Sequence, residues 1–529
     1  MSFSRYFIRK SVESIQRDSS QHALKRTLGK WNLVSLGIGC IIGAGIFVMT
    51  GKAAADHAGP AIMLSFVFAG IACALAGLCY AELASVLPVS GSAYTYAYAT
   101  LGESLAWIMG WLLILEYGLA ASTVAVGWSG YVTSFMAKNM HIPIPPIWTA
   151  AYGEIVKLPD GGTVTALFNL PAFLAVMAVT TLLYVGVSES AKVNNIIVGI
   201  KVAVVMAFIG IGAFYINTAN WHPFIPDVVH SAIPGGEDKY GMSGVVRAAG
   251  IIFFAYIGFE AVSTAAQEAK DPQKDMPFGI LGSLTICTVL YILVCAVLTG
   301  IVPYTKLSVP DPMAVAVDAI GLGWFSILIK IGAITGLSSV MLVLIYGQTR
   351  IFYVMGRDGL LPGFFCKVHE RLKTPYINTW LVGTSVAFVA ALTPISILGD
   401  LVSLGTLSAF IIVCFSVRYL RMTQPDLPRP FRTPGYPVVP LLGIAACIYL
   451  VHDIPALVYQ RLAGWFILGV VIYVGYGQFH SRLAHADNVS ERVVSTDREV
   501  KAFTRAIIEV AIVIALVVFG LPLVEDFFK

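Results

Sequence analysis

Two apolar segments interrupted by glycine decide the fold: Ser35-Leu36-Gly37-Ile38-Gly39-Cys40-Ile41-Ile42-Gly43-Ala44-Gly45-Ile46-Phe47 and Ile251-Ile252-Phe253-Phe254-Ala255-Tyr256-Ile257-Gly258-Phe259-Glu260. Glycine inside a helix costs about 1 kcal/mol relative to alanine, so these clusters indicate points where a helix opens. Non-helical backbone is tolerated at membrane depth only where protein buries it or where it lines a cavity. A pair of interruptions in corresponding halves of a chain therefore predicts a binding site between the two segments.

The composition is that of a membrane protein. The 529 residues are 57% hydrophobic and 12% charged, whereas soluble domains are about 25% charged. Apolar runs of about 20 residues recur along the chain, and this is the length that a helix needs to cross a bilayer. These features exclude a large soluble enzyme and predict an all-α polytopic protein embedded in a lipid bilayer.

The apolar runs predict thirteen membrane spans. The first is too long for a cleaved signal peptide and lacks a small-residue cleavage site. The last contains Glu509 and ends near Pro522, but it is apolar on all faces, which favours spanning over lying in the interface. The spans fall near residues 33–51, 61–87, 104–136, 168–187, 194–217, 244–266, 278–302, 321–349, 378–394, 397–419, 437–452, 460–479 and 503–524.

Lysine and arginine residues predict the orientation, because they concentrate in cytoplasmic loops. The loops at 350–377, 419–437 and 480–502 are basic, whereas the stretches at 137–167 and 218–243 are poor in basic residues. The segment before the first span holds Arg5, Arg9, Lys10, Arg17, Lys25, Arg26 and Lys30. We therefore expect a cytoplasmic N-terminus in a bacterial inner (plasma) membrane. The formal charge of +4 reflects this topology, and the scattered basic residues exclude a nucleic-acid surface.

Enzymatic and metal chemistry find no support in the sequence. The eight cysteines lie singly in or beside apolar runs, which fits neither a disulfide framework nor a zinc site. No Walker loop, HExxH motif or nucleophile–base pairing is present. We expect a protein that is not an enzyme and uses no metal or organic cofactor.

The two interrupted segments are the first and the sixth predicted spans. Counting five spans from each predicts two inverted repeats, 31–218 and 244–419, related through the membrane plane. The fold class is thus a 5+5 inverted-repeat transporter core with discontinuous helices 1 and 6, plus peripheral helices 11–13. The remaining parts are a cytoplasmic N-terminal segment (1–30), helices 11 and 12 (437–479), a cytoplasmic linker (480–502) and a thirteenth helix (503–524).

Opened helices recognise charge through their backbone. The half-helix that starts exposes N–H groups, which attract a carboxylate, and the half-helix that ends exposes C=O groups, which attract an ammonium. Two facing breaks can therefore hold both ends of an α-amino acid. The alternative is that the glycines only permit close helix packing; the pairing of two breaks favours a site. The predicted substrate-binding residues are Ile41, Gly43, Ala44 and Gly45 for the carboxylate, and Phe254, Ala255, Ile257 and Gly258 for the ammonium.

Ionisable residues inside the spans are functional candidates by default. Lys201 is the one charge in 196–216; it either binds and releases a proton in an apolar environment or extends to the cytoplasmic interface. Glu116 lies near the middle of the third span as a proton carrier, gate or pocket residue. Glu260 follows the second break directly, and Tyr256 lies within it as a lid or wall.

The chain contains four recognisable motifs. In order along the sequence they are residues 39–47, Tyr80-Ala81-Glu82-Leu83-Ala84 with the stretch that continues to 88–94, residues 253–260, and Arg350 followed by residues 355–362. On these motifs the chain resembles the amino acid–polyamine–organocation superfamily of permeases, and most of all bacterial members of the cationic amino acid transporter family. The resemblance covers residues 25–480. It implies a ten-helix core with two extra helices, alternating access, and the backbone roles given above. A thirteenth helix departs from that pattern.

The resemblance also implies proton coupling. Lys201 matches a fifth-helix lysine that replaces a sodium ion in proton-dependent relatives, which favours a coupling role over extension to the interface. Relatives with a glutamate like Glu116 resemble carriers of neutral amino acids, and Met341 on the eighth helix is expected to narrow the side-chain pocket.

These residues predict a permease that imports L-amino acids with H⁺ as the coupling ion, with small neutral substrates favoured and cationic ones possible. The alternatives are an amino-acid exchanger without net proton coupling and a membrane sensor that binds amino acids without transport. The absence of a sizeable soluble domain argues against the sensor. Neither the individual substrate nor the oligomeric state follows from the sequence.

Overall fold

The protein is described here from a computed structural model covering residues 8–11, 26–88, 92–158, 162–186, 191–231, 238–372, 374–452, 454–485, 492–493 and 497–528. Residues 1–7, 12–25, 486–491 and 494–496 of the predicted cytoplasmic segments, together with Val89, Ser90 and Gly91 of the second motif, lie outside these residues. Within them the chain is mainly helical, and each of the thirteen predicted apolar runs contains a helix.

The helices of the first half begin with the interrupted segment and continue through four further spans. The interrupted segment comprises α2 (Lys30–Ile41), a π-helical turn at Gly45–Met49 and α3 (Thr50–Ala53). The others are α4 (Ile62–Val86), α6 (Glu103–Lys138), α7 (Leu170–Val185) and α8 (Ala191–Gly212).

The second half has the same order of helices. Its interrupted segment comprises α9 (Gly241–Ile252) and 3-10 turns at Phe253–Tyr256 and Glu260–Glu268. The next four are α10 (Pro272–Ile301), α12 (Gly323–Arg357), α13 (Tyr376–Leu392) and α14 (Ile395–Thr423). The last are α15 (Val438–His452), α16 (Ala456–Ile472), α17 (Gln478–His480) and α18 (Asp497–Phe528).

The described residues contain eight helical segments long and apolar enough to cross a membrane, and α7, α13 and α15 are shorter apolar helices. The prediction of an all-α polytopic membrane protein is therefore confirmed. The inverted 5+5 symmetry and the spanning of α18 stay predictions.

Local sequence signals explain where individual helices begin and end, as α7 illustrates. The Asn169 side chain accepts a hydrogen bond from the Ala172 N–H at 3.2 Å, and Pro171 occupies the first turn. Such a cap stabilises a helix by about 1 kcal/mol. The helix ends at Gly186, whose φ of +89° suits a residue without a side chain.

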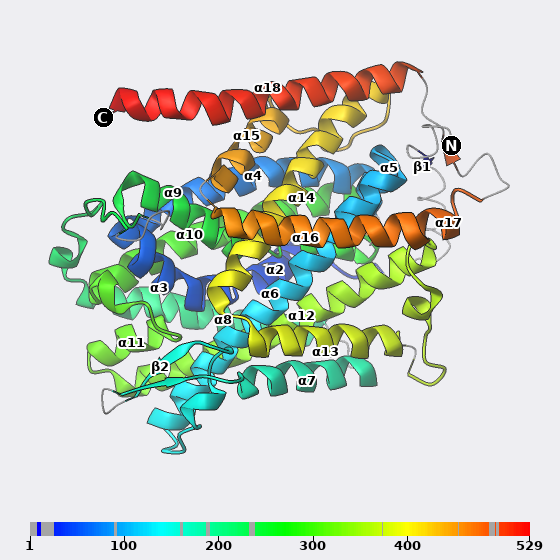
Figure 1. The fold of residues 1–529 in the computed structure, drawn as a ribbon. Helices are drawn as coiled ribbons and strands as arrows, with labels where there is room; N and C mark the ends of the chain where they lie inside the picture. Colours follow the sequence, from blue (N-terminus) through cyan, green and yellow to red (C-terminus); the bar gives the residue numbers. More distant parts are fainter. Residues whose placement is uncertain are drawn as a thin grey trace.

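The core of the molecule is built around α6 and α10. Helix α6 packs against α12 and α14, and α10 packs against α2 and α4. As Figure 1 shows, β1 (Arg9–Lys10), α5 (Ser92–Thr100) and the start of α18 lie at one end of the molecule, while α3, α11 (Pro312–Ala319) and β2 lie toward the other. The interrupted segments lie between these ends.

Several short elements were not predicted from the sequence, because they are not long apolar runs. They are α5, α11 and two small antiparallel sheets. One sheet pairs β2 (Ile155–Lys157) with β3 (Thr163–Thr165). The other pairs β1 with β4 (Arg492–Val493), which joins segments from near both ends of the chain.

Candidate functional site

The first predicted interruption is present. Helix α2 ends at Ile41, the following Ile42 is extended with φ −70° and ψ 94°, and helical structure resumes as a π-helical turn that begins at Gly45. Ile41 is the last residue of α2, so its N–H belongs to the helical ladder, whereas Gly43, Ala44 and Gly45 open the next half-helix. Because no turn of this half-helix precedes them, their N–H groups have no carbonyl acceptors within the helix.

The second interruption is also present. Helix α9 ends at Ile252, a tight turn covers Phe253–Tyr256, and Gly258 has a φ of +119° before the chain resumes at Glu260. Only glycine adopts this backbone conformation without strain. The Phe254 carbonyl accepts a hydrogen bond from the Ile257 N–H at 3.2 Å, while no described residue donates to the Ile257 carbonyl.

The two breaks touch each other at two points. A Cβ atom on Gly45 would lie 2.3 Å from Ala255 Cα, and one on Gly258 would lie 2.7 Å from Cys40 Cβ. Close packing, the alternative explanation for the glycines, is therefore correct at these two positions and is compatible with a site. At Gly43 the nearest side-chain atom would be 3.4 Å away, in Val340, which is an ordinary contact.

A tyrosine that the sequence-based reading missed links the breaks. Tyr291 lies on α10. Its hydroxyl is the donor in a hydrogen bond that is shared between two acceptors, the Ile41 carbonyl at 2.7 Å and the Ala255 carbonyl at 3.1 Å. Tyr291 is buried. One hydroxyl therefore joins the end of α2 to the turn that follows α9.

Lys201 is tied to the first break. Its side chain is fully buried, and Nζ donates a hydrogen bond of 2.8 Å to the Gly39 carbonyl in the last turn of α2. The aliphatic stem packs against Gly336 of α12. The ammonium thus lies at the negative end of α2 and does not extend to the interface.

Glu260 is tied to the second break. Both of its carboxylate oxygens accept from the Gly258 N–H, at 3.1 and 2.9 Å, and the residue is fully buried. A carboxylate at the start of a helix is stabilised by the exposed N–H groups. Glu260 therefore holds the left-handed glycine and the resumed helix together.

Glu116 is the unusual member of the site. It is fully buried on α6, and neither of its carboxylate oxygens has a hydrogen-bond partner within the described chain. The hydroxyls of Tyr80 and Tyr117 are likewise buried without a partner. The Tyr80 ring contacts that of Phe259 edge-on, with centroids 5.7 Å apart, so Tyr80 lies beside the second break, and Glu116 interacts electrostatically with Glu260 at the same break.

The remaining candidates are held by the core. The Tyr256 hydroxyl donates to the Phe66 carbonyl of α4 at 2.9 Å, which fixes the ring at the break. Met341 is fully buried on α12 and follows Val340, the residue that faces Gly43. Tyr256 is thus held at the second break, whereas Met341 is established only as a buried neighbour of Val340 on α12.

Helix α9 leads into the second break, and an ion pair joins this helix to α14. Arg247 on α9 lies 3.0 Å from Asp400 on α14, with both side chains largely buried. Tyr131 on α6 donates to the Phe47 carbonyl at 2.7 Å. The sequence-based reading missed the pair of Arg247 with Asp400 because these two residues are 153 positions apart.

A second cluster of ion pairs surrounds Glu82. Glu82 on α4 is buried and accepts from Arg421 of α14 through both carboxylate oxygens, and from the Thr433 N–H at 2.8 Å. Arg429 lies 3.4 Å from the same carboxylate. Glu82 therefore joins α4 to α14, and the residues of both breaks are buried.

Comparison with known proteins identifies the family. A family model described as amino acid permease matches residues 28–476. This chain belongs to the amino acid permease family. The matched region includes both breaks, Lys201 and Glu116.

Individual relatives agree with this assignment. The permease is 48% identical over 479 residues to the branched-chain amino acid permease BcaP of Bacillus subtilis, covering 90% of this chain and 98% of the relative. It is 44% identical to the methylthioribose transporter of B. subtilis, with 90% and 99% covered. It is 37% identical to the vacuolar cationic amino acid transporter 4 of Arabidopsis thaliana, with 79% and 67% covered.

These similarities confirm the predicted membership of the amino acid–polyamine–organocation superfamily. The relatives are transporters and not enzymes. Together with the apolar helices they show a multi-pass membrane protein that transports a small molecule.

Proposed function

We propose that the permease imports neutral, apolar L-amino acids of the branched-chain class together with protons, by alternating access in a bacterial plasma membrane. One observation carries this proposal. The two breaks create four half-helix ends, and the protein itself supplies a charge to two of them: Lys201 at the C-terminal end of α2 and Glu260 at the start of the helix after Gly258.

The two remaining ends have the polarity of an amino acid. The N–H groups of Gly43, Ala44 and Gly45 suit a carboxylate, and the C=O groups of Ala255 and Ile257 suit an ammonium. The Phe254 and Ala255 carbonyls each accept an internal bond, from the Ile257 N–H and the Tyr291 hydroxyl, but each retains a second lone pair, so both stay in the predicted set. Both charged ends of an amino acid are thereby bound without a charged side chain.

The surroundings of the breaks favour an apolar substrate side chain. Met341, Val340 and Phe259 are buried and apolar. Two relatives, at 48% and 34% identity, are branched-chain amino acid permeases. Cationic substrates, the other class considered from the sequence, would need Glu116 as a charged partner for their distal group.

Lys201 is proposed to hold the coupling proton. A charged ammonium makes a stronger hydrogen bond to the Gly39 carbonyl than a neutral amine does. Loss of the proton therefore weakens the contact between α8 and the end of α2, and α2 is freed to tilt when the site opens to the cytoplasm. The exchanger without net proton coupling is the competing account, in which Lys201 only supports α2.

A second substrate class follows from a specific observation. The methylthioribose transporter is 44% identical to this permease, and the unpartnered groups of Glu116, Tyr80 and Tyr117 suit a ligand rich in hydroxyls. A sugar carries neither an ammonium nor a carboxylate, so it would leave both free half-helix ends without a charged partner.

Uptake of labelled L-leucine into proteoliposomes, with a panel of competitors, tests these assignments. We expect L-isoleucine and L-valine to compete, and 4-methylpentanoate, which lacks the ammonium, and isopentylamine, which lacks the carboxylate, to fail. Each lost charge-assisted interaction is worth about 1.5–3 kcal/mol, or a loss of about 10- to 150-fold in affinity. Equal competition by either truncated analogue, or competition only by methylthioribose, would contradict the proposed substrate class.

A further inference from the structure

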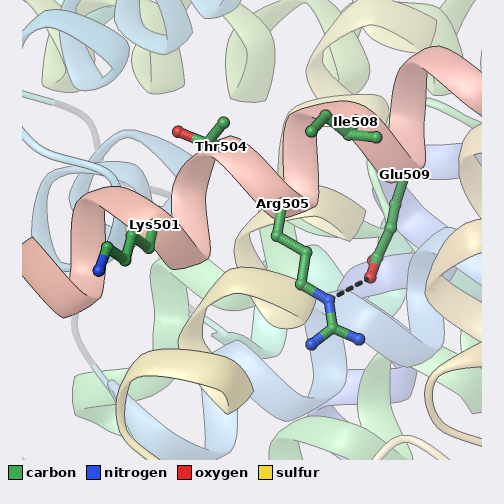
Figure 2. Close-up of a pocket in the computed structure, with 5 residues that line it drawn as sticks. All are labelled: Lys501, Thr504, Arg505, Ile508 and Glu509. Atoms are coloured by element: carbon green, nitrogen blue, oxygen red, sulfur yellow. Dashed lines mark hydrogen bonds and ion pairs between the residues drawn. The ribbon is translucent and has the colours of Figure 1, made fainter.

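A shallow surface hollow lies on α18, beginning about one turn after the start of the helix. Its volume is about 450 Å³, and the described residues that line it are Lys501, Thr504, Arg505, Ile508 and Glu509. Figure 2 shows that Lys501, Arg505 and Glu509 follow one edge of the helix in this view, and Thr504 and Ile508 the other. The hollow therefore combines basic, hydroxyl and apolar groups within three turns of one helix.

The hollow carries an excess of positive charge. Glu509 accepts two hydrogen bonds of 2.8 Å from Arg418 of α14, so its carboxylate is already paired. Arg505 reaches the same carboxylate at 3.3 Å, but its side chain is 72% exposed. Lys501 is exposed as well. Because Arg418 balances the charge of Glu509, Lys501 and Arg505 supply two positive charges that attract an anion.

Contacts with the core fix the position of this part of α18. The Phe503 ring contacts the rings of Tyr419 and Phe415 on α14, with centroids 5.6 Å apart in each case. Ala506, on the same side of the helix, is buried. Together with the Arg418–Glu509 pair, these contacts hold the turns that carry the basic residues before any ligand binds, which lowers the cost of binding.

A row of apolar side chains continues from the hollow along α18. Ile508, Ile512 and Leu516 follow Thr504 at intervals of four residues, and they are 53%, 53% and 68% exposed. Residues four apart lie one above the other on a helix. The row from Thr504 to Leu516 is about 18 Å long at about 1.5 Å per residue, which is comparable with one leaflet of a hydrocarbon core about 30 Å thick.

We propose that the hollow binds an anionic phospholipid of the cytoplasmic leaflet. Its phosphate lies between Lys501 and Arg505, and an acyl chain lies along Ile508, Ile512 and Leu516. A guanidinium donates paired hydrogen bonds to phosphate oxygens, and an ammonium adds a point charge. A zwitterionic headgroup carries its own cation beside the phosphate, so the two basic residues attract it less. A dissolved phosphate has the charge but lacks the acyl chain, so it gains nothing from the apolar row.

Native mass spectrometry of the full-length permease tests this site without relying on transport. Phosphatidylglycerol and phosphatidylcholine with the same acyl chains are added in equal amounts. We expect phosphatidylglycerol to bind about 30-fold more tightly, which corresponds to two basic residues at about 1 kcal/mol each. Lys501→Gln with Arg505→Gln should remove this preference, whereas Lys501→Arg with Arg505→Lys keeps both charges and should retain it.

The matched control removes two charges elsewhere on the predicted cytoplasmic side. Lys270 and Lys274 are exposed at the start of α10, and Lys270→Gln with Lys274→Gln should leave the preference unchanged. A loss of preference in this control would show that the attraction is a general effect of charge and not a site on α18, and it would overturn the proposal.

A photoreactive phosphatidylglycerol locates the bound lipid. It should label peptides of α18 in the natural protein, and this labelling should be lost in the variant with Lys501→Gln and Arg505→Gln. Inorganic phosphate in excess should leave the labelling in place; its loss would identify a dissolved anion as the ligand. Equal binding of the two lipids by the natural protein, or an unchanged preference in the glutamine variant, also overturns the proposal.

Discussion

The two breaks are built alike but are held in different ways. At the second break, Glu260 bonds to Gly258 only two residues away, so the tie is local and persists as long as the turn does. At the first break, Lys201 reaches Gly39 from a helix 162 residues further along the chain. A distant tie makes the shape of the break depend on the position of another helix and on the charge of the lysine. We therefore place proton coupling at the first break and a constant binding geometry at the second.

The largest expected effect comes from removing the distant tie. Lys201→Ala should abolish accumulation of leucine driven by an imposed pH gradient, because the variant lacks the amine that is proposed to carry the coupling proton. Lys201→Arg keeps the charge but cannot release its proton, so it should fail in the same assay while folding normally. Gradient-driven accumulation by either variant would remove the distinction between the breaks.

Steric contact between the breaks should give the next largest effect. Gly45→Ala places a Cβ 2.3 Å from Ala255 Cα, and overpacking of this kind costs about 1–3 kcal/mol or more. We expect leucine binding to weaken by about 10- to 100-fold. Gly43→Ala is the matched control because its Cβ meets Val340 at an ordinary 3.4 Å. Equal affinities for the two variants, measured by thermal stabilisation with leucine, would show that the breaks do not form one site.

Weakening the local tie should matter less than removing the distant one. Glu260→Gln keeps an oxygen that accepts from the Gly258 N–H but loses the negative charge at the helix start, which is worth about 0.3–1 kcal/mol. Uptake should fall about two- to fivefold with proton coupling intact. Loss of coupling in this variant, with substrate binding retained, would place the proton at the second break instead.

An effect of similar size is expected at the link between the breaks. Tyr291→Phe removes the hydroxyl that donates to the Ile41 and Ala255 carbonyls, and a hydrogen bond of this kind contributes about 0.5–1.5 kcal/mol. Leucine affinity should fall about two- to tenfold. Tyr256→Phe loses a similar bond to Phe66, which lies on α4 and not on the other break. A larger effect at Tyr256 than at Tyr291 would contradict the linking role.

The sequence predicted the breaks because glycine has a local cost that is visible without a structure. It also predicted each apolar helix, since composition and length suffice for a membrane span. The polar contacts between helices could not be predicted in the same way. Tyr291, and the pair of Arg247 with Asp400, join residues that are 36 to 250 positions apart, and nothing in the local pattern identifies such partners.

Strands β1 and β4 escaped prediction for a different reason. Strands β1 and β4 contain two residues each, which is too short for an alternating pattern. The charges of Arg9 and Lys10 were assigned to topology, as the positive-inside rule directs. Their structural roles, an ion pair with Glu499 and another with Asp358, depend on contacts with the far end of the chain and with the end of α12.

The most direct test of proton coupling at the first break is the internal pH of proteoliposomes when leucine is added outside with no imposed gradient. If Lys201 carries the coupling proton, leucine entry acidifies the interior of vesicles that contain the natural protein, and vesicles with Lys201→Ala show no acidification. Leucine uptake by the natural protein at constant internal pH would contradict the account and would support exchange without net proton movement.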